Sequence, residues 1–538
     1  MSPTDAASAG PSPSALPERL RSGFAAEIAL LILPAIILVA GLVMIGQMSP
    51  IYSGLRNLDY DPAYPYLFNG VGLMKGYNPG LIEHPGTTVQ LMAGIISIVS
   101  WSAARLCGLT ALAFPASVGA NPEEYLRIIM TVFLAMNCAM IWWLGSSIAR
   151  SANVLAAGVA CQCGYLLFGS LFPRIFHLGA ETFLFLAAAG LMATLAPALF
   201  ADKECSDKRA WAVGFFVGLG ICSKINFFPL ALLVLLLRRR RPIAIAMSAS
   251  ALFALFFLIP ILGQSRQVIS WLIVLASHDG AHGSGTAGPI DWAAVPERFG
   301  KIVTAEPLLV VAATALMAVI AFSGSRDRRK AIIISAAAGT VVLLVVKNFS
   351  IHYLVPAVAI APAAIVWAIG RLPRKSRVYA AAAAAAAAIG ITSTWNLSSA
   401  FAQERALRRT NERAIADAIA KYDNPVVIGN YRAGYKPLAI LMGLTWSDWK
   451  FARQFPQTAA PDFLTYIAGQ KKLWRPHSGP VDWSYLAQFE KAGRAVLIIE
   501  SRGSDAIETQ AARIEPVLDQ GFGDTLGRIV LTPNAASN

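Results

Sequence analysis

Apolar runs long enough to cross a lipid bilayer recur along this chain, and they restrict its fold more than any other feature. A membrane-spanning helix needs about 20 mostly apolar residues. Only 14% of the 538 residues are charged, against roughly 25% in soluble domains. The sequence therefore predicts a polytopic, mainly α-helical membrane protein. Runs near the required length lie at residues 24–47, 125–149, 152–172, 178–200, 242–263, 305–323, 331–347, 351–370 and 378–396.

Residues 210–237 form a longer apolar stretch that is interrupted by the sequence Cys-Ser-Lys-Ile-Asn around Lys224. We interpret it as two short segments that meet at a break. With these two segments the chain is expected to make about eleven crossings.

Clusters of basic residues predict the orientation of the helices, because cytoplasmic loops of membrane proteins are rich in Lys and Arg. Such clusters occur at 238–241, 326–330 and 371–377, in every second loop. Placing all three in the cytoplasm puts the N-terminus inside and everything after residue 397 outside. These loops account for the net charge of +14, so no nucleic-acid partner is expected.

The segment after the first helix does not follow this alternation. On the predicted topology residues 48–86 and 110–124 are both outside, so the apolar stretch from 87 to about 116 cannot make a single net crossing. We expect it to lie along the membrane surface or to enter and return. The first outer loop then spans residues 48–124.

Composition divides the chain into three parts. Residues 1–22 are rich in Ser, Pro and Ala and are expected to be a disordered cytoplasmic N-terminus. Residues 23–397 form the membrane domain. From residue 398 to 538, more polar helical patterns separate three short segments with the composition of strands, which predicts an extracytoplasmic α/β domain. The three segments are VVIGNY (426–431), AVLIIE (495–500) and RIVLTP (528–533).

Ionisable residues at a membrane edge are costly, so each is a candidate for function. On the predicted topology all six histidines share the outer face. A carboxylate there can act as a general base toward a hydroxyl or an amine, while cations stabilise a phosphate leaving group. The set therefore indicates group transfer from a lipid phosphate outside the cytoplasm. The candidates on this face are Asp59, Asp61, His84, Arg174, His177, Glu181, Lys224, His278, His282, Lys347, His352 and Tyr353.

Each candidate also has a purely structural explanation. An Asp-x-Asp sequence often caps a helix or forms a solvated turn, Arg174 and Lys347 can simply extend to the interface, and Glu181 can pair with a neighbouring cation. His278 and His282 lie in a Gly-rich loop without an obvious third ligand, so zinc is not expected there. The shared side of the membrane, more than any one residue, favours a functional reading.

Four stretches resemble motifs of the membrane glycosyltransferases of the GT-C fold, especially bacterial relatives of protein O-mannosyltransferases and of lipid A aminoarabinose transferases. They are DPAYPYLFNGVGLMKG (61–76), IEHPGTTVQ (82–90), GLGICSKINFFPL (218–230) and KNFSIHYLVPA (347–357). The resemblance covers roughly residues 24–370. Two departures stand out: Pro62 occupies the place of a second acid in many relatives, and Gly86 replaces the second proline of their [HK]-P-P segment.

The resemblance implies a role for each candidate. Asp61 would be the catalytic general base, with Asp59 as the second candidate. The donor phosphate would be bound by Lys224, Lys347, His352, Tyr353 and Arg174. The cavity and the acceptor site would be lined by His84, His177, Glu181, His278 and His282.

Metal dependence stays open. An Asp-x-Asp sequence binds a divalent cation in oligosaccharyl-type members of the fold, so Asp59 and Asp61 could hold Mg²⁺ or Mn²⁺. The mannosyl- and aminoarabinosyl-type relatives work without a metal, and no cofactor is the expectation for this chain.

The resemblance implies a hexosyl- or pentosyltransferase in the bacterial inner membrane. It would move a sugar, with inversion, from a polyprenyl-phosphate donor to a lipid, glycan or protein acceptor on the periplasmic side. The loop 264–304 is expected to gate the donor, and the α/β domain to lie above the site. The sequence names neither the sugar, the acceptor nor the oligomeric state.

Two other classes remain as alternatives. A transporter or lipid flippase usually has repeated halves and polar residues at mid-membrane depth, and the sequence shows neither. An O-antigen ligase or polymerase would favour an arginine-rich outer loop, but 264–304 contains only Arg266 and Arg298.

Overall fold

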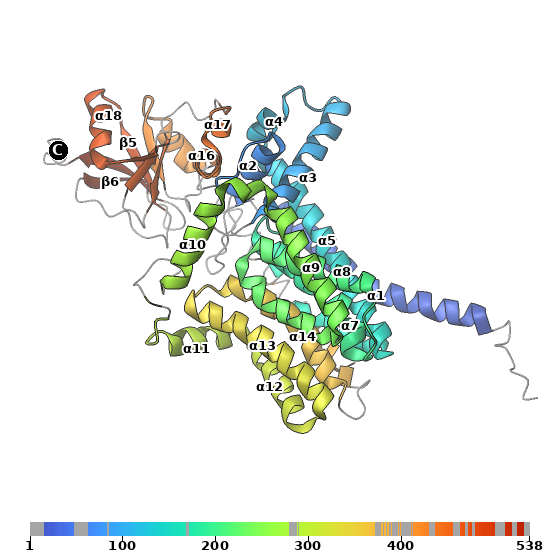
Figure 1. Ribbon diagram of the computed structural model, residues 1–538. Coiled ribbons are helices and arrows are strands. Elements are labelled where there is room, and N and C mark those ends of the chain that lie inside the picture. Colours follow the sequence, from blue (N-terminus) through green and yellow to red (C-terminus); the bar gives the residue numbers. More distant parts are fainter. Residues whose placement is uncertain are drawn as a thin grey trace, which may run out of the picture.

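The computed structural model shows a bundle of helices with a small sheet domain at one end (Figure 1). The described residues are 15–47, 63–82, 86–167, 172–278, 290–371, 413–429, 436–455, 463–467, 472–475, 479–500, 512–518 and 525–531, with isolated positions at 288 and between 378 and 410.

The described elements from α1 to α14 are all helical. Its α-helices are α1 (Ala15–Gln47), α2 (Ala63–Met74), α3 (Thr87–Leu106), α4 (Phe114–Ala120), α5 (Pro122–Ala152), α6 (Leu155–Gly164), α7 (Ala180–Phe200), α8 (Asp207–Ser223), α9 (Arg240–Leu258), α10 (Ser265–Ser277), α11 (Val295–Ala305), α12 (Pro307–Phe322), α13 (Ser325–Lys347) and α14 (Val355–Ile369). Tighter 3₁₀ segments connect them: η1 (Tyr165–Leu167), η2 (Phe172–Ile175), η3 (Ile225–Leu237), η4 (Ile259–Gln264) and η6 (Ile351–Leu354).

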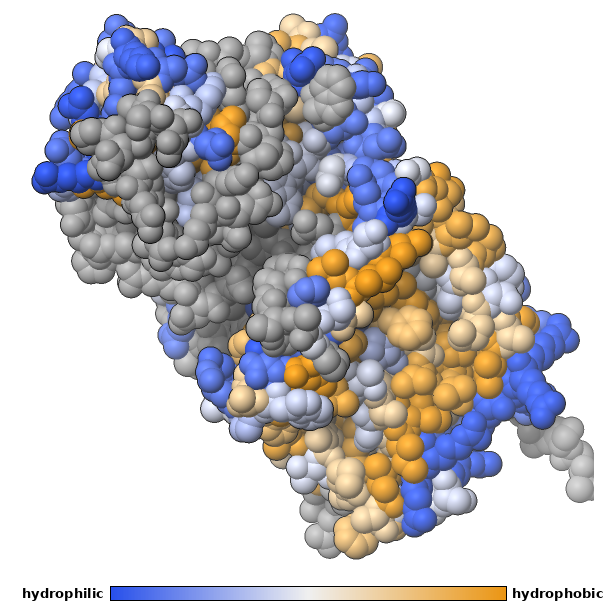
Figure 2. Space-filling model, turned by 60° about the vertical axis from the view of Figure 1, so that its left-hand side comes forward, coloured by the Kyte–Doolittle hydropathy of each residue, from blue (hydrophilic) through white to orange (hydrophobic). Residues whose placement is uncertain are grey.

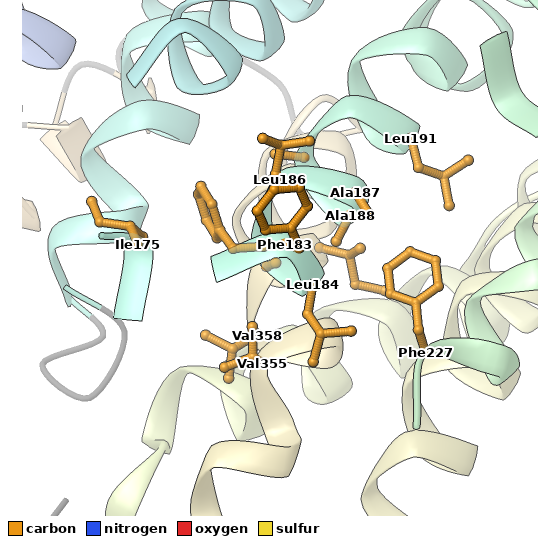
Figure 3. Packing of buried hydrophobic residues seen from close by; sticks show 14 of the residues in the cluster. Ile175, Phe183, Leu184, Leu186, Ala187, Ala188, Leu191, Phe227, Val355 and Val358 are labelled. Atoms are coloured by element: carbon orange, nitrogen blue, oxygen red, sulfur yellow. The ribbon is translucent and has the colours of Figure 1, made fainter. Parts of the chain in front are cut away.

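Helix α7 lies at the centre of the bundle. Its sequence is apolar on every side, which is the pattern of a helix enclosed by others, and nearly every residue from Ala180 to Leu199 is buried. Phe183, Leu184 and Leu191 of α7 pack with Phe227 of η3 and with α14 (Figure 3). The two ends of α7 are therefore fixed positions, separated by about 30 Å at 1.5 Å per residue.

The basic loops gather at the end of the bundle where α7 finishes. Asp202 follows α7 and pairs with Arg238 and Arg326, and Arg371, after α14, pairs with Asp327. Figure 2 shows a hydrophobic band between a row of hydrophilic residues at this end and the hydrophilic sheet domain at the other. The described residues of the three basic clusters, with Arg371 from the third, thus share one end, which is called the basic end below.

Within the described residues, seven helices are long and apolar enough to cross a membrane, or eight if α11 and α12, bent by 96°, form one span. The segments Leu155–Leu167 and Ile225–Leu237 are apolar but shorter. Sequence reasoning counted both of these short segments as crossings, whereas it excluded α3, which passes the length and composition test. The expected last span, 378–396, falls largely outside the described residues.

Two helices form within the expected outer loop 264–304. Residues Ser265–Ser277 form α10 and Val295–Ala305 form α11. The side of the membrane on which this segment lies, and its role as a gate, stay predictions.

The predicted break in 210–237 is confirmed. Helix α8 ends at Ser223, Lys224 has extended backbone angles (φ −163°, ψ 137°), and η3 begins at Ile225. Pro229 inside η3 has no N–H to donate to a regular α-helix, which explains why the second half is wound differently. The break places the Lys224 side chain inside the bundle.

The C-terminal part is an α/β domain with a seven-stranded mixed sheet in the order β4-β3-β2-β1-β5-β7-β6. The central strand β1 is parallel to β2 and β5, while the remaining pairs are antiparallel. All three predicted strands are confirmed, as β1, β5 and β7. The elements are β1 (Val426–Gly429), α16 (Lys436–Thr445), α17 (Trp449–Ala452), β2 (Phe463–Ile467), β3 (Lys472–Arg475), β4 (Gly479–Val481), η9 (Trp483–Leu486), α18 (Ala487–Lys491), β5 (Val496–Glu500), β6 (Ala512–Leu518) and β7 (Thr525–Leu531).

Alternation along the central strands gives the sheet two buried faces, because successive side chains of a strand point to opposite sides. Val427 packs with Leu441 of α16, whereas Ile428 packs with Leu486 and Phe489 beside α18. Both faces are covered, which is typical of a sheet with parallel central strands.

The sheet domain is attached to the helical part through α2. Asn69 donates from Nδ2 to the carbonyl oxygen of Trp446 at 2.8 Å, and the rings of Phe68 and Phe455 pack edge to face with centroids 5.4 Å apart. A side chain at Gly443 in α16 would come within 2.7 Å of Phe68. The close contact places the domain next to the segment that begins two residues after Asp61.

Candidate functional site

The candidate site is built around the first turn of α7, at the end of the bundle opposite to the basic end. A turn at residues 174–179 leads into the helix. The hydroxyl of Thr182 donates to the carbonyl oxygens of Arg174 and His177, and Asn137 of α5 donates to that of Ile175 at 2.6 Å. These bonds fix the turn. Arg174 and His177 are buried within it.

Glu181 lies in the first helical turn of α7 and forms a buried ion pair with Lys224. The distance from Lys224 Nζ to Glu181 Oε1 is 2.9 Å, and the side chains are 3% and 4% exposed. A carboxylate is favoured at a helix N-terminus by the helix dipole. The ammonium of Lys224 also lies 4.4 Å from the ring centre of Tyr353, a cation–π contact.

His352 completes this group from the connection between α13 and α14. Its Nε2 lies 3.8 Å from Glu181 Oε1, and its Nδ1 shares a 2.7 Å hydrogen bond with the hydroxyl of Ser350. Asn226, two residues after Lys224, donates to the carbonyl oxygen of Tyr353 at 2.8 Å. The bonds of Ser350 and Asn226 hold the ring of His352 and the backbone of Tyr353 in place.

The start of α3 lies beside the same group. The hydroxyls of Thr88 and Ser223 share a buried hydrogen bond of 2.7 Å, and Ser223 directly precedes Lys224. Thr88 follows His84 by four residues. The start of α3 is therefore joined to the break that carries Lys224.

Lys347 and His278 both contact the C-terminal end of α10. The ammonium of Lys347 donates to the carbonyl oxygens of Leu275 and Ala276 at 2.9 and 2.6 Å. His278 Nδ1 lies 3.1 Å from the carbonyl oxygen of Val274. In this state both side chains satisfy carbonyl groups at the C-terminal end of α10. Lys347, which the sequence assigned to the donor phosphate, thus binds α10 here.

Four predicted site residues fall outside the described residues: Asp59, Asp61, His84 and His282. Their roles stay predictions. Among the described residues, no group of three or more His, Cys, Asp or Glu could hold a metal ion. The pair Asp59 and Asp61, for which metal binding stays open, is not in that set.

Sequence reasoning did not single out the residues that support the site. Asn137, Thr182, Asn226 and Ser350 are all buried. The last three bond a candidate residue or its backbone, and Asn137 bonds the backbone of Ile175, next to Arg174. A buried polar residue one or two positions from a candidate was the available signal, since Asn226 and Ser350 lie within two residues of Lys224 and His352.

The group has the chemistry of an anion site. Arg174 and Lys224 are buried basic side chains at this end of the bundle, and Glu181 is the carboxylate that pairs with Lys224. Inside a bundle a positive charge attracts a negatively charged ligand more strongly than it would in water. Lys224 has three donors, so it can keep its bond to Glu181 while it binds a phosphate oxygen.

Comparisons with known proteins agree with this architecture. Residues 106–346, less than half of the chain, match the model of glycosyltransferase family 87. No curated protein matches the chain. Among solved structures the chain is similar to ArnT from Cupriavidus metallidurans, crystallised with undecaprenyl phosphate. The TM-score is 0.55 with 12% sequence identity, over 95% of this chain and 99% of that one. The resemblance derived from the sequence is thereby confirmed for the fold: this chain is a multi-pass membrane protein with the GT-C fold of membrane glycosyltransferases.

Proposed function

We propose that the protein transfers a sugar from a polyprenyl-phosphate donor to an acceptor on the extracytoplasmic side of the membrane. The observation that carries the proposal is the buried group of Glu181, Lys224, His352 and Tyr353 at the end of the bundle opposite to the basic end. The family match and the fold support a glycosyltransferase. The polyprenyl phosphate bound by ArnT supports the class of donor.

In the proposed reaction Asp61 accepts the proton of an acceptor hydroxyl or amine. The acceptor atom attacks the anomeric carbon of the donor from the face opposite to the phosphate, so the configuration inverts. The bond between the anomeric carbon and the phosphate oxygen breaks, and its electron pair stays on that oxygen. Lys224 and Arg174 stabilise the charge of the departing polyprenyl phosphate.

Glu181 positions Lys224 in this proposal. Its carboxylate lies 2.9 Å from the Lys224 ammonium and holds it in one position. The ring of His352, oriented by Ser350, lies on the same side of Glu181. The donor phosphate would therefore meet a preformed set of donors rather than flexible side chains.

The deciding experiment is sugar transfer by Asp61→Asn, measured with purified protein and a radiolabelled polyprenyl-phosphate sugar. Asparagine keeps the shape of aspartate but cannot accept the proton, so we expect the rate to fall by a factor of about 10²–10⁴, the usual contribution of a general base. Asp59→Asn is the matched control and should keep most of the activity.

Two outcomes contradict parts of this assignment. If Asp59→Asn is as inactive as Asp61→Asn and Mg²⁺ or Mn²⁺ stimulates the wild type, the aspartates bind a cation instead. If Asp61→Asn transfers sugar at the wild-type rate, Asp61 is not the base. Transport of a lipid-linked glycan that is insensitive to both changes would favour a flippase.

A further inference from the structure

A second charged site lies at the basic end, far from the group around Glu181. It is a cavity of about 370 Å³ between the end of η3 and the start of α13. Its walls combine one hydroxyl, four cations and three aliphatic side chains. They are formed by Leu235, Leu236, Arg238, Ser325, Arg326, Arg329, Lys330 and Ile333.

Positive charge exceeds negative charge around this cavity. One carboxylate, Asp202, forms ion pairs with three of the cations: Lys330 at 2.7 Å, Arg238 at 2.5 Å and Arg326 at 3.3 Å. Burial raises the pKa of Asp202, but the hydrogen bonds and charges of Lys330 and Arg238 outweigh burial and hold its pKa below the usual value. Asp202 is therefore ionised, and both of its carboxylate oxygens already form ion pairs.

Helix α13 adds to the excess of positive charge around the cavity. The cavity lies at the N-terminus of α13, where the helix dipole is positive. The first two turns carry Arg326, Arg328, Arg329 and Lys330 against one carboxylate, Asp327, which pairs with Arg371 and lies 4.0 Å from Lys330. Cations at this end of a helix are unfavourable unless an anion offsets them. Arg238 adds a second unfavourable feature, because its φ is +64°, a region that side chains other than glycine rarely occupy.

The apolar wall indicates where the anion comes from. Leu235 lines the cavity and is 42% exposed on the surface of the helical bundle. A ligand in this cavity would therefore contact cations on one side and lipid-facing side chains on the other. A volume of about 370 Å³ is at the lower end for ligand pockets, which suits a headgroup rather than a whole lipid.

We propose that this cavity binds the phosphodiester headgroup of an anionic phospholipid, with the acyl chains lying along the aliphatic side of η3. Basic pockets between membrane helices bind such headgroups by the same combination of charge and apolar contact. The bound lipid would hold η3 against α13 at the basic end. The site is independent of the proposed sugar transfer.

Arg329 gives the sharpest test. It is exposed, it lines the cavity, and no ion pair joins it to any other described residue. Arg240, at the start of α9, is also exposed and outside the cavity lining. Arg329→Glu and Arg240→Glu change the net charge of the basic end equally. A difference in lipid binding between the two variants therefore shows that the cavity binds the lipid, because general attraction to the basic end would affect both equally.

The measurement is lipid retention by the full-length protein in native mass spectrometry, with thermal melting in detergent as a second readout. Dioleoyl phosphatidylglycerol should stay bound and raise the Tm of the wild type and of Arg240→Glu. Arg329→Glu should bind it about tenfold more weakly, the effect of one lost charged hydrogen bond. Phosphatidylcholine should neither stay bound nor raise the Tm.

Three results would overturn the proposal. Equal retention by both variants would mean that the cavity is not the site. Equal loss in both would mean that the lipid is held by the general charge of this end. Inorganic phosphate that reproduces the full rise in Tm, at the concentration at which the lipid acts, would identify a soluble anion as the ligand. Each variant is first melted without lipid, and a Tm equal to that of the wild type shows that the variant is folded.

Discussion

Glu181 and Lys224 depend on each other because both are almost completely buried. Removing either side chain leaves the other as an uncompensated charge, which typically costs about 3–5 kcal/mol in proteins. Removing both leaves no charge behind. This property separates the structural role of the pair from its proposed role in binding the donor phosphate.

We therefore predict that Lys224→Met and Glu181→Gln each lower the Tm clearly, whereas the double variant recovers most of the loss. Sugar transfer should behave differently and stay low in the double variant, because the phosphate still lacks Lys224. The Tm in detergent and the rate of sugar transfer are measured for the wild type, the two single variants and the double variant. Recovery of activity together with stability would show that Lys224 acts only in folding.

Ser350 acts on the ring of His352 through a single hydrogen bond. We predict that Ser350→Ala lowers the rate of transfer up to about tenfold, because one hydrogen bond contributes roughly 0.5–1.5 kcal/mol. Ser350→Thr keeps the hydroxyl and should restore the rate. If alanine and threonine give equal rates, the orientation of His352 does not matter for the reaction.

At the scale of elements, the contact between α2 and α16 joins the sheet domain to the helical part. It is close because α16 has no side chain at Gly443, where a Cβ would meet Phe68 at 2.7 Å and Tyr64 at 2.9 Å. At Gly72 in α2, a Cβ would meet Phe451 at 3.6 Å and Tyr77 at 3.8 Å, which are ordinary distances.

This difference predicts that Gly443→Ala separates the two elements and that Gly72→Ala does not. Overpacking of this kind costs about 1–3 kcal/mol, enough to loosen the domain without unfolding the bundle. Limited proteolysis should release the C-terminal domain faster from Gly443→Ala than from the wild type. Equal digestion rates for Gly443→Ala and Gly72→Ala would mean that other contacts hold the domain.

At the scale of the whole molecule, two cysteines distinguish the ends of the bundle. Cys107 is exposed after α3, and Cys205 is partly exposed at the basic end, whereas Cys138, Cys161 and Cys222 are buried. The topology derived from the basic loops puts Cys107 outside and Cys205 in the cytoplasm.

A membrane-impermeant maleimide added to intact spheroplasts should therefore label Cys107 and not Cys205, as read from Cys107→Ser and Cys205→Ser variants. Burial raises the pKa of the Cys205 thiol, so the same reaction in permeabilised membranes, at mildly alkaline pH, is the control for its reactivity. Labelling of Cys205 alone in intact cells would invert the topology. Labelling of neither would mean that Cys107 is not on the outer surface.

Much of the site could be anticipated from single residues. Lys224 interrupts an apolar run, and Glu181 and His352 begin apolar helices, so the cost of burying a charge identified them without a structure. Asn226 and Ser350 were not anticipated, because a neutral polar residue is common in any loop. Their importance comes only from the partners they meet, which are 127 and two residues away.

The amino-acid sequence by itself determined the membrane class, the break at Lys224, the shared end of the basic loops and the strands at the centre of the C-terminal sheet. These follow from local hydrophobicity and charge, which each segment carries wherever it is placed. Only the tertiary structure decided that Glu181, Lys224 and His352 share one buried site while Lys347 binds α10. Contacts between distant segments depend on how helices pack, and packing is a property of the whole chain.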